Sequence, residues 1–385
     1  MLDKALKGSA TYWGWLLFLL AFIGVGFGCY LYQFSEGLRI TGMSRDVSWG
    51  FYIGQFTYLV GVAASGVMVV LPYYIHNYKA FARITILGEF LAVSAIVMCG
   101  LFISVDLGYL PRVMNIILYP HPNSILFWDM IVLNVYLLLN IFIGWNVLSA
   151  ERKGVHYPKW ITPLIYISIP WAFSIHTVTA FLYAGLPGRH FWLTAIMAAR
   201  FLASAFCSGP ALLILLCFIV RKLSRFDPGK EQIRTLGGIV AYAMILNVFF
   251  FLLELFTAFY SRIPEHMHAI VYLFFGLEGH TRLVPWMWGA TVFAVIALVL
   301  LIIPQLRRRE GILAIACGSV IVATWIDKGL ALVVGGFIPN PFDRIFEYWP
   351  TTPEVFISLG VYATGFFVLS VLYKIAVSVK EEVAA

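Results

Sequence analysis

Charged residues are scarce in this sequence: Asp, Glu, Lys and Arg make up 12% of its 385 residues, whereas hydrophobic residues make up 61%. A typical water-soluble domain carries about twice that share of charged residues, so the composition argues against a soluble domain. The Lys and Arg residues are scattered and are not interleaved with aromatic residues in a patch. The net charge of +7 therefore gives no support to nucleic-acid binding.

Ligands for metals and haem are scarce as well. The five cysteines all fall in apolar stretches and show no C-x-x-C spacing, so they supply neither an iron–sulfur cradle nor a disulfide framework. Of the eight histidines, only His176 lies deep in an apolar stretch, whereas a b-type haem in a membrane usually needs paired axial ligands inside the bundle. We therefore expect no metal, haem or iron–sulfur cluster in this chain.

What the sequence does contain is ten stretches of mostly apolar residues. Each stretch has about 20 residues, which is enough to cross the hydrocarbon core of a bilayer as a helix. The sequence predicts an all-α polytopic membrane protein with spans near 14–34, 50–75, 84–105, 124–149, 162–185, 193–220, 236–260, 285–304, 312–336 and 353–377. The first stretch is longer than a signal-peptide core, so we expect it to be retained as a helix.

The Lys and Arg residues predict the orientation. Seventeen of the 26 lie in the N-terminal segment and every second loop, and seven lie in the alternate loops. Because short cytoplasmic loops are enriched in Lys and Arg, we expect a protein of the cytoplasmic membrane with both termini in the cytoplasm. Three outer segments, 106–123, 261–284 and 337–352, are long and rich in proline and aromatic residues, and we expect a partner to dock there.

A weak internal repeat relates spans that lie four apart. His176 precedes Pro187 by the same interval by which Lys328 precedes Pro339. An offset of four spans preserves orientation, so a true repeat would be a parallel duplication of two four-helix bundles. We expect a single membrane domain over 1–385, with a first bundle at about 50–185, a second bundle at about 193–336 and flanking helices at 14–34 and 353–377.

Polar residues inside the spans are the candidates for function. A charged side chain at the bilayer centre costs about 2.5 to 3.5 kcal/mol on insertion scales, so a retained one normally has a partner or a task. Six polar residues lie at compatible depths in the outer half of the first bundle: His176, Asp129, Asp106, Gln55, Tyr58 and Asn134. Together they offer donors and acceptors for the carbonyl oxygens of a quinone headgroup.

Quinone chemistry moves protons with electrons, and a histidine beside a buried carboxylate can exchange protons near neutral pH. The alternative is that His176 and Asp129 only hydrogen-bond and tie helices together. Glu89, near the inner end of the third span, is placed to admit protons to the first bundle from the cytoplasm.

Four charged residues occupy the outer half of the second bundle: Arg200, Glu254, Asp327 and Lys328. Their formal charges cancel, which suits a neutral network that staples the sixth, seventh and ninth spans together. The same residues also suit a second pocket or a proton path. Both interpretations stay open.

Several motifs resemble the NrfD/PsrC family of membrane subunits. The segments Asp106-Leu-Gly-Tyr-Leu-Pro-Arg112, Tyr119-Pro-His-Pro-Asn-Ser124 and Trp128-Asp129 are similar to the family pattern DLGRP…P-x-P-x-S…WD, with Tyr109 and Leu110 as a departure. Further similar elements are Ser174-Ile-His-Thr-Val178, Leu186-Pro-Gly-Arg-His190, Ser208-Gly209, Glu254 with Tyr260-Ser261, and Trp325-Ile-Asp-Lys328. Arg189 stands where the family's PGWH element has Trp, and the last element reads W-x-E-R in the family.

The resemblance covers the second to ninth spans, and the segment Ser44-Arg-Asp-Val-Ser-Trp-Gly50 looks most like the DsrP, QrcD and HmcC branch from sulfate reducers. It implies a subunit without a redox centre of its own that exchanges electrons between menaquinone or menaquinol and an extracytoplasmic, ferredoxin-like iron–sulfur subunit. It further implies a multihaem cytochrome c and other membrane subunits as partners, and a link to sulfite or sulfate respiration. By motif position the quinone site maps onto Asp129 and His176, with Asp106 beside them.

A secondary transporter is the alternative class of function. Duplicated bundles and buried charges suit a transporter, whose central site is typically built from broken helices. Against it, no pair of spans is conspicuously interrupted by glycine or proline at the midplane, although Pro72, Pro170 and Pro210 can kink helices. Purification discriminates the two classes, because a bound quinone and iron–sulfur or haem absorbance favour the electron-transfer hypothesis.

Overall fold

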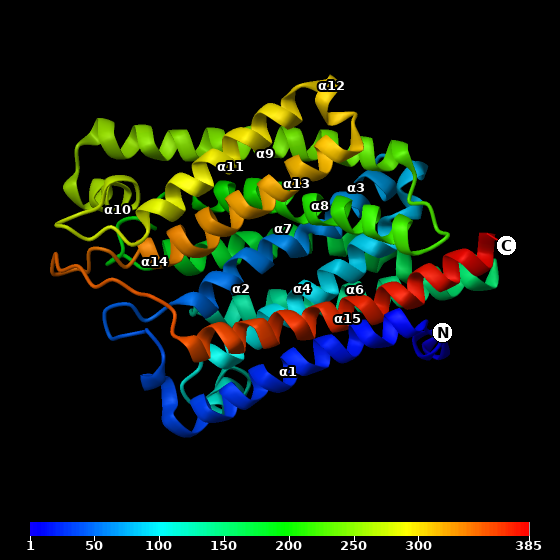
Figure 1. Ribbon diagram of the computed structural model, residues 1–385, viewed down its shortest axis with the longest axis horizontal. Helices are drawn as coiled ribbons and strands as arrows, with labels where there is room; N and C mark the ends of the chain where they lie inside the picture. Colours follow the sequence, from blue (N-terminus) through cyan, green and yellow to red (C-terminus); the bar gives the residue numbers. More distant parts are fainter. Residues whose placement is uncertain (385) are drawn as a thin grey trace.

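The computed structural model describes residues 1–384 and shows an elongated bundle of long helices that run side by side (Figure 1). Within this range, ten helical segments are long and apolar enough to span a membrane. Extended structure in the same residues is limited to one isolated bridge between Leu277 and His280. The prediction of an all-α polytopic protein with ten spans is confirmed.

The spans follow the chain in order and overlap the predicted stretches. They are α1 (Ala10–Glu36), α2 (Phe51–Val62) continued by α3 (Val67–Tyr74), α4 (Thr85–Asp106), α6 (Ile125–Lys153), α7 (Ile161–Ala184), α8 (Met197–Leu223), α9 (Lys230–Ser261), α11 (Val284–Ile302), α13 (Glu310–Thr324) continued by α14 (Leu332–Gly335), and α15 (Thr352–Ala384). Short helices in the connections are α5 (Asn115–Leu118), α10 (Pro264–Phe275) and α12 (Pro304–Arg307).

Several helices extend beyond their predicted ends, and the two that extend furthest make polar contacts past the apolar stretch. α9 starts before residue 236, where Glu231 accepts a hydrogen bond from the Tyr78 hydroxyl at 3.0 Å. α15 continues past residue 377, where Lys380 donates to Glu151 at 2.7 Å. Hydropathy locates the part of a helix that meets lipid, but not the polar turns that extend it.

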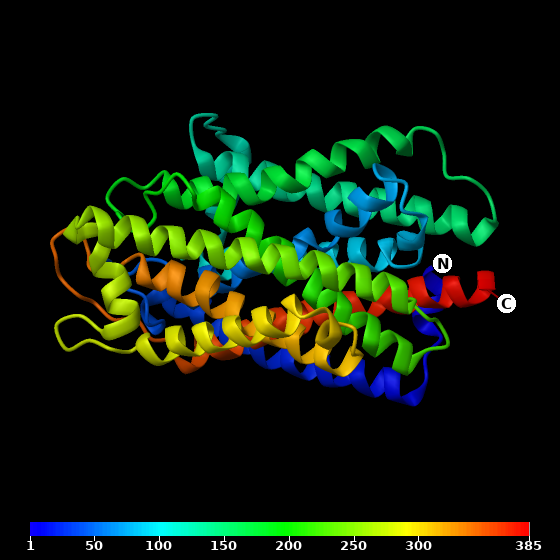
Figure 2. The same ribbon diagram turned by 90° about the horizontal axis from the view of Figure 1, so that it is seen from above.

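For description, the helices are divided into two groups and a flanking pair. Contacts connect α2, α4, α6 and α7 in one group and α8, α9, α11 and α13 in the other, and α2 and α7 also contact α8 across the groups. α1 lies along α15, and α15 in turn lies against α4 (Figure 1; Figure 2). Both termini lie at one end of the bundle, here called the terminal side (Figure 1). The opposite end, called the distal side, carries the segments 106–123, 261–284 and 337–352.

Two spans depart from regular α-helix, which corrects the expectation of uninterrupted spans. The second span passes through a 3₁₀ turn at Ala63–Ser65, and the ninth passes through a π-helical segment at Trp325–Ala331. Such local changes often mark functional positions or places where another element approaches closely. Neither change is centred on a proline, but a glycine adjoins or lies within each one: Gly66 follows Ser65, and Gly329 lies inside the π-helical segment.

Close backbone contact explains the positions of these changes. A Cβ atom at Gly209 of α8 would lie 2.7 Å from the Ser65 nitrogen and 3.0 Å from the Val62 oxygen. On the other side of the second span, a Cβ at Gly54 would lie 2.7 Å from the carbonyl oxygen of Gly329. Only glycine permits these approaches, so the second span can lie between α8 and the π-helical segment.

We predict that Gly209→Ala destabilises the protein, because the added methyl group meets fixed backbone atoms rather than a flexible side chain. Overpacking of this kind costs about 1–3 kcal/mol, so the melting temperature of the detergent-solubilised protein should fall. Gly238→Ala in α9 is the matched control, since a Cβ there has open space. An equal effect of the two substitutions would contradict the close contact.

Candidate functional site

His176 on α7 is one of several buried groups with unused hydrogen-bonding capacity. Its side chain is fully buried, and neither ring nitrogen has a hydrogen-bond partner within residues 1–384. Its ring lies edge-on to Phe206 of α8, with the centroids 6.4 Å apart. A buried polar group without a partner costs free energy. This imidazole is therefore suited to bind a ligand.

Asp129 on α6 is held in place by a residue that the sequence analysis missed. Thr179, one turn from His176 on α7, lies with its Oγ1 2.6 Å from Asp129 Oδ1 and 2.8 Å from the carbonyl oxygen of Ile175. Residues three apart share one face of a helix, so Thr179 was detectable from its spacing to His176. Asp129 thus contacts Thr179 of α7, and His176 lies one turn away on the same helix with its ring beside Phe206 of α8; these residues are here called the His176 layer.

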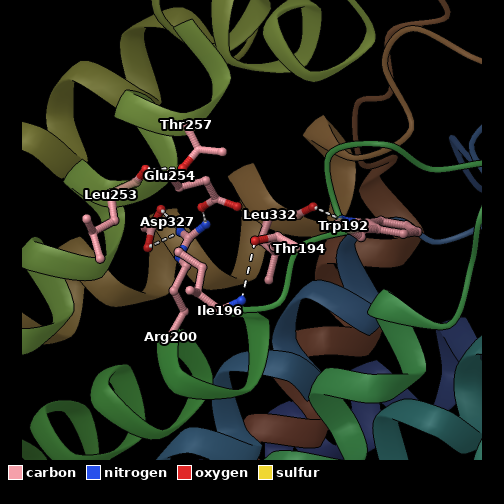
Figure 3. Close-up of polar contacts among 9 residues, drawn as sticks. All are labelled: Trp192, Thr194, Ile196, Arg200, Leu253, Glu254, Thr257, Asp327 and Leu332. Carbon is pink, nitrogen blue, oxygen red and sulfur yellow. Dashed lines mark hydrogen bonds and ion pairs between the residues drawn. The ribbon is translucent and has the colours of Figure 1, made fainter. Parts of the chain in front are cut away.

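Aromatic rings cover this layer on the distal side. The Tyr183 hydroxyl is hydrogen-bonded to Thr57 of α2, and its ring lies 5.5 Å from Trp49 and 5.1 Å from Trp192, both in edge-to-face geometry. Trp192 donates from Nε1 to the carbonyl oxygen of Leu332 at 2.7 Å (Figure 3). These rings fill the space between the polar layer and the distal surface.

Arg189 ties three distal loops together above the rings. Its guanidinium donates to the carbonyl oxygens of Phe337 and Asp46, each at 3.3 Å, and lies 4.3 Å from the centre of the Phe337 ring. Asn340 donates to Asp46 Oδ1 at 2.7 Å. Burial lowers the pKa of the Arg189 guanidinium, and Asp46 opposes that shift. Arg189 thus has a structural role where the resembling family has tryptophan.

Gln55 and Tyr58 point toward the ninth and tenth spans. Gln55 Oε1 accepts hydrogen bonds from Trp325 Nε1 and from the Tyr362 hydroxyl, both at 2.7 Å, while its Nε2 has no partner within the described part of the chain. Tyr58 lies beside Gly329: a Cβ placed on Gly329 would be 3.7 Å from the Tyr58 Cβ. The two residues line the boundary between the two helix groups.

Asn134 does not join the other candidates. It is exposed on the outside of α6, and its Nδ2 donates to the carbonyl oxygen of Met130 at 2.8 Å. The expectation that it faces the same cavity as His176 is therefore wrong. Its depth was suitable, but each residue along a helix turns by about 100°, and depth alone does not fix the side it faces.

Asp106 lies at the distal end of α4 beside another carboxylate. Its Oδ1 is buried without a partner within residues 1–384, and Glu354 of α15 acts on it electrostatically. Glu354 is fully buried and accepts hydrogen bonds from the Thr351 and Gly42 nitrogens at 2.8 and 2.7 Å and from the Tyr348 hydroxyl at 2.6 Å. Thr351 and Glu354 form one half of a capping box, since the Glu354 carboxylate accepts from the Thr351 backbone nitrogen; the sequence analysis did not use this T-x-x-E pattern.

The charged residues of the second group form a network of three rather than four (Figure 3). Arg200 is ion-paired with Glu254 and donates to the two carboxylate oxygens of Asp327 at 3.3 and 3.4 Å. It therefore connects α8, α9 and the π-helical segment. Lys328 is not part of this network: its Nζ lies 3.5 Å from the Phe201 carbonyl oxygen and 4.2 Å from the centre of the Phe201 ring.

Lys328 instead faces the second span. A Cβ placed on Gly61 would lie 3.3 Å from Lys328 Nζ and 3.2 Å from Ser208 Oγ. Adjacent helical residues face different sides, which is why Asp327 and Lys328 have different partners. Lys328 also acts electrostatically on His176, so its ammonium group belongs to the boundary between the two helix groups.

Glu89 lies toward the terminal side of α4. Its Oε2 is buried without a partner among the described residues and would lie 3.2 Å from a Cβ at Gly144 of α6. Two polar atoms approach Gly66 of the interrupted second span. A Cβ placed on Gly66 would lie 3.3 Å from the Tyr136 hydroxyl oxygen and 3.2 Å from Asn140 Oδ1. Polar atoms therefore lie between Glu89 and the centre of the molecule.

Three cavities lie away from the His176 layer. One of about 560 Å³ is on the terminal side at Lys380 and Glu151, one of about 180 Å³ is on the distal side at Arg189 and His190, and one of about 10 Å³ adjoins Arg200. His176 itself is enclosed by packed side chains. Within residues 1–384 no cluster of three or more His, Cys, Asp or Glu side chains is arranged to hold a metal ion.

Comparison with known proteins agrees with this architecture. Residues 39–338 match the protein family described as "Polysulphide reductase, NrfD". A putative membrane subunit of a dimethyl sulfoxide reductase from Halobacterium salinarum is 26% identical, with 91% of this chain and 88% of that protein aligned. The integral membrane subunit of an Hdr-like menaquinol oxidoreductase from Archaeoglobus fulgidus is 24% identical over 70% of this chain and 66% of that protein.

The integral membrane subunit of a menaquinone reductase from Nitratidesulfovibrio vulgaris is 20% identical, over 94% of this chain and 90% of that protein. These relatives are named as membrane subunits of reductases or oxidoreductases, which are assemblies of several subunits. The matched region runs from the loop before α2 to the loop after α14 and contains the His176 layer and the Arg200 network. Because this match covers well over half of its length, the chain belongs to the NrfD family.

Proposed function

We propose that this chain is the quinone-interacting membrane subunit of a respiratory complex. In this proposal it exchanges electrons between menaquinone or menaquinol and an extracytoplasmic iron–sulfur subunit. The observation that carries the proposal is the fully buried His176, whose two ring nitrogens lack partners within residues 1–384, beside an Asp129 that Thr179 holds in position. The names of two relatives, which contain menaquinol and menaquinone, support the choice of quinone.

The residues present fit a quinone headgroup. A quinone supplies two-electron chemistry coupled to protons, and its carbonyl oxygens need hydrogen-bond donors. His176 can donate from one ring nitrogen, and Gln55 has a free amide group at the boundary of the two helix groups. Asp129 exchanges a proton with the bound headgroup or with His176. Because the layer is enclosed, binding requires side chains between the helices to move.

The distal segments 261–284 and 337–352 are proposed to receive the iron–sulfur partner, together with 106–123. Glu347 joins the first two segments by accepting hydrogen bonds from the Tyr272 hydroxyl at 3.0 Å and the Arg282 nitrogen at 2.9 Å, and it is ion-paired with His280 at 3.2 Å. Burial acts to raise the pKa of the Glu347 carboxyl, but these donors outweigh burial and lower it. The joined surface exposes Phe342 and Trp349, and aromatic side chains are frequent at protein interfaces.

The proposed orientation, the cytochrome partner and the role in sulfur respiration rest on the sequence. The bias of Lys and Arg places the terminal side in the cytoplasm, so the distal surface faces outward. The similarity of segment 44–50 to the DsrP branch supports a multihaem cytochrome c as a further partner and a role in sulfite or sulfate respiration. The subunits that copurify with the chain test both points.

Glu89 is proposed to pass protons from the terminal side toward the His176 layer. Its unpartnered Oε2 and the polar atoms of Tyr136 and Asn140 near Gly66 support such a path. For the Arg200 network we favour a structural role, because Arg200 connects three helices through two carboxylates.

A secondary transporter remains the second candidate, and one observation favours it. The irregular segments Ala63–Ser65 and Trp325–Ala331 interrupt two spans that contact each other, as the broken helices of transporters do. Solute uptake by the isolated chain in vesicles, without a bound quinone, would support this alternative over the electron-transfer proposal.

We predict that His176→Ala lowers quinol-linked electron transfer by a factor of about 100 or more, in the range contributed by acid–base groups, while assembly of the complex is kept. Removing an unpartnered ring breaks no hydrogen bond within residues 1–384, so the loss of stability should be limited to the cavity left beside Phe206. The measurement is quinol oxidation by the purified complex. His76→Ala, at an exposed histidine on the terminal side, is the control. Full activity of the His176 variant would refute its assignment as headgroup ligand.

Asp129→Asn should reduce turnover more than quinone binding, because the amide keeps the shape and the contact with Thr179 but cannot exchange the proton. Thr179→Val provides the contrast, since it removes the hydrogen bond that orients Asp129 and leaves the carboxylate intact. The kcat and KM for quinol are measured for both variants. Weakened binding with unchanged turnover in Asp129→Asn would leave Asp129 a positioning role only.

For the Arg200 network we predict that removing the cation alone is worse than removing the cation together with one carboxylate. Glu254→Gln leaves Arg200 paired with Asp327, whereas Arg200→Gln leaves the buried Glu254 and the half-buried Asp327 without their cation. An unpaired buried charge costs about 3–5 kcal/mol, so Arg200→Gln should melt earlier in detergent than Glu254→Gln, and the Arg200→Gln/Glu254→Gln double variant should recover part of that loss. Unchanged stability of both single variants, with reduced proton-coupled activity of Glu254→Gln, would favour a proton path instead.

A further inference from the structure

α15 lies beyond the family match, which ends at residue 338, yet its polar side chains reach three candidates for function. Tyr362 donates to Gln55 at 2.7 Å, and Glu354 acts electrostatically on Asp106. Toward the terminal side, Lys380 acts electrostatically on Glu89. The helix therefore contributes polar groups at several depths. The one nearest the terminal side, Lys380, lies at the cavity of about 560 Å³ described above.

That cavity, of about 560 Å³, lies where α15 meets α6 and the loop between α8 and α9. Its lining includes Lys380 and Glu381 of α15, Glu151 of α6, and Arg225 and Asp227 of the loop. Positive and negative side chains are both present, so the cavity is suited to water rather than to an ion of one sign. A water-filled space at this end gives protons a place from which to enter the bundle.

An ion pair separates the cavity from the interior. Lys380 is almost fully buried, and its Nζ donates to Glu151 Oε1 and Oε2 at 2.7 and 2.9 Å and lies 3.4 Å from the carbonyl oxygen of Ala82. Lys380 thereby connects α15 with α6 and the segment that leads into α4. Glu89 lies deeper between the same three elements, next to Gly144 of α6.

The distance along α6 from the Lys380–Glu151 ion pair to Glu89 is short. Gly144 lies seven residues before Glu151 on α6, which corresponds to about 10 Å along a helix with a rise of 1.5 Å per residue. Tyr373 of α15, at a similar depth, donates to the Leu87 carbonyl oxygen at 2.8 Å and closes the side between α15 and α4. The Lys380–Glu151 pair therefore lines the cavity about three helical turns of α6 or less from the carboxyl group.

We propose that the terminal-side cavity is the entrance through which protons reach Glu89, and that the Lys380–Glu151 ion pair controls this entrance. The inference rests on the role of Glu89 in the proposed function. Opening the pair connects water in the cavity with Glu89, and closing it isolates the carboxyl group while the His176 layer reacts. Tyr74 of α3, on which the Glu89 carboxyl acts electrostatically, marks the competing approach.

The test is chemical access to Glu89 in membrane vesicles whose terminal side faces the bath. A water-soluble carbodiimide with a small amine is added, and modification of Glu89 is followed by peptide mass spectrometry. We expect Lys380→Met and Glu151→Gln to increase the labelling rate several-fold over the native chain, and Glu89→Gln to remove the labelled site. Tyr74→Phe should leave the rate unchanged.

Two controls separate a controlled entrance from general loosening. Lys374→Met removes a lysine from the same helix, where it lies over the Tyr12 ring, and Arg221→Gln breaks another terminal-side ion pair, with Glu310. Both should label Glu89 at the native rate. Unchanged labelling in the Lys380 and Glu151 variants, an equal rise in both controls, or a rise only in Tyr74→Phe would overturn the proposal.

This readout does not depend on quinone chemistry. His176→Ala should label Glu89 as the native chain does. If that variant keeps full quinol activity while the Lys380 variants show the expected rise, the proposed quinone role of His176 fails and the proton entrance stands. If quinol activity depends on His176 but labelling does not respond to Lys380, the entrance alone is refuted.

Discussion

The second span can lie at the centre of the molecule because glycine residues let other helices approach its backbone. Gly209 of α8 meets the turn at Ala63–Ser65, and Gly54 meets Gly329 of the π-helical segment. A side chain at these points would push the neighbouring helices outward. This central position carries Gln55, Thr57 and Tyr58 to the boundary between the two helix groups, where they meet residues from both.

The contacts around the second span also fit a duplication of two bundles. Under an offset of four spans, the second span corresponds to the sixth and the fifth to the ninth. The contact of α2 with the π-helical segment then corresponds to the contact of α8 with α7, and both contacts are present. His176 and Lys328 become equivalent positions in such a repeat. One carries a ring whose nitrogens lack partners within residues 1–384, and the other an amine that faces the second span.

The sequence predicted the spans well because lipid imposes a long apolar stretch on each one. It predicted the depth of polar residues for the same reason, and Asp129 contacts Thr179, one turn from His176. It did not predict the side that each residue faces. Asn134 turns outward and Lys328 turns away from Arg200, since facing depends on helix rotation and, in the ninth span, on a π-helical segment. Thr179 and Glu354 carried recognisable local patterns and were still overlooked.

The central claim is that a quinone headgroup binds in the layer of His176 and Asp129. Photolabelling the purified protein with an azido-naphthoquinone, followed by peptide mass spectrometry, tests it most directly. The account predicts labels on the α6 and α7 peptides that contain Asp129 and Thr179, suppressed by excess menaquinone analogue. Labels confined to α9 and α11, or labels on α7 that the analogue does not suppress, would contradict it.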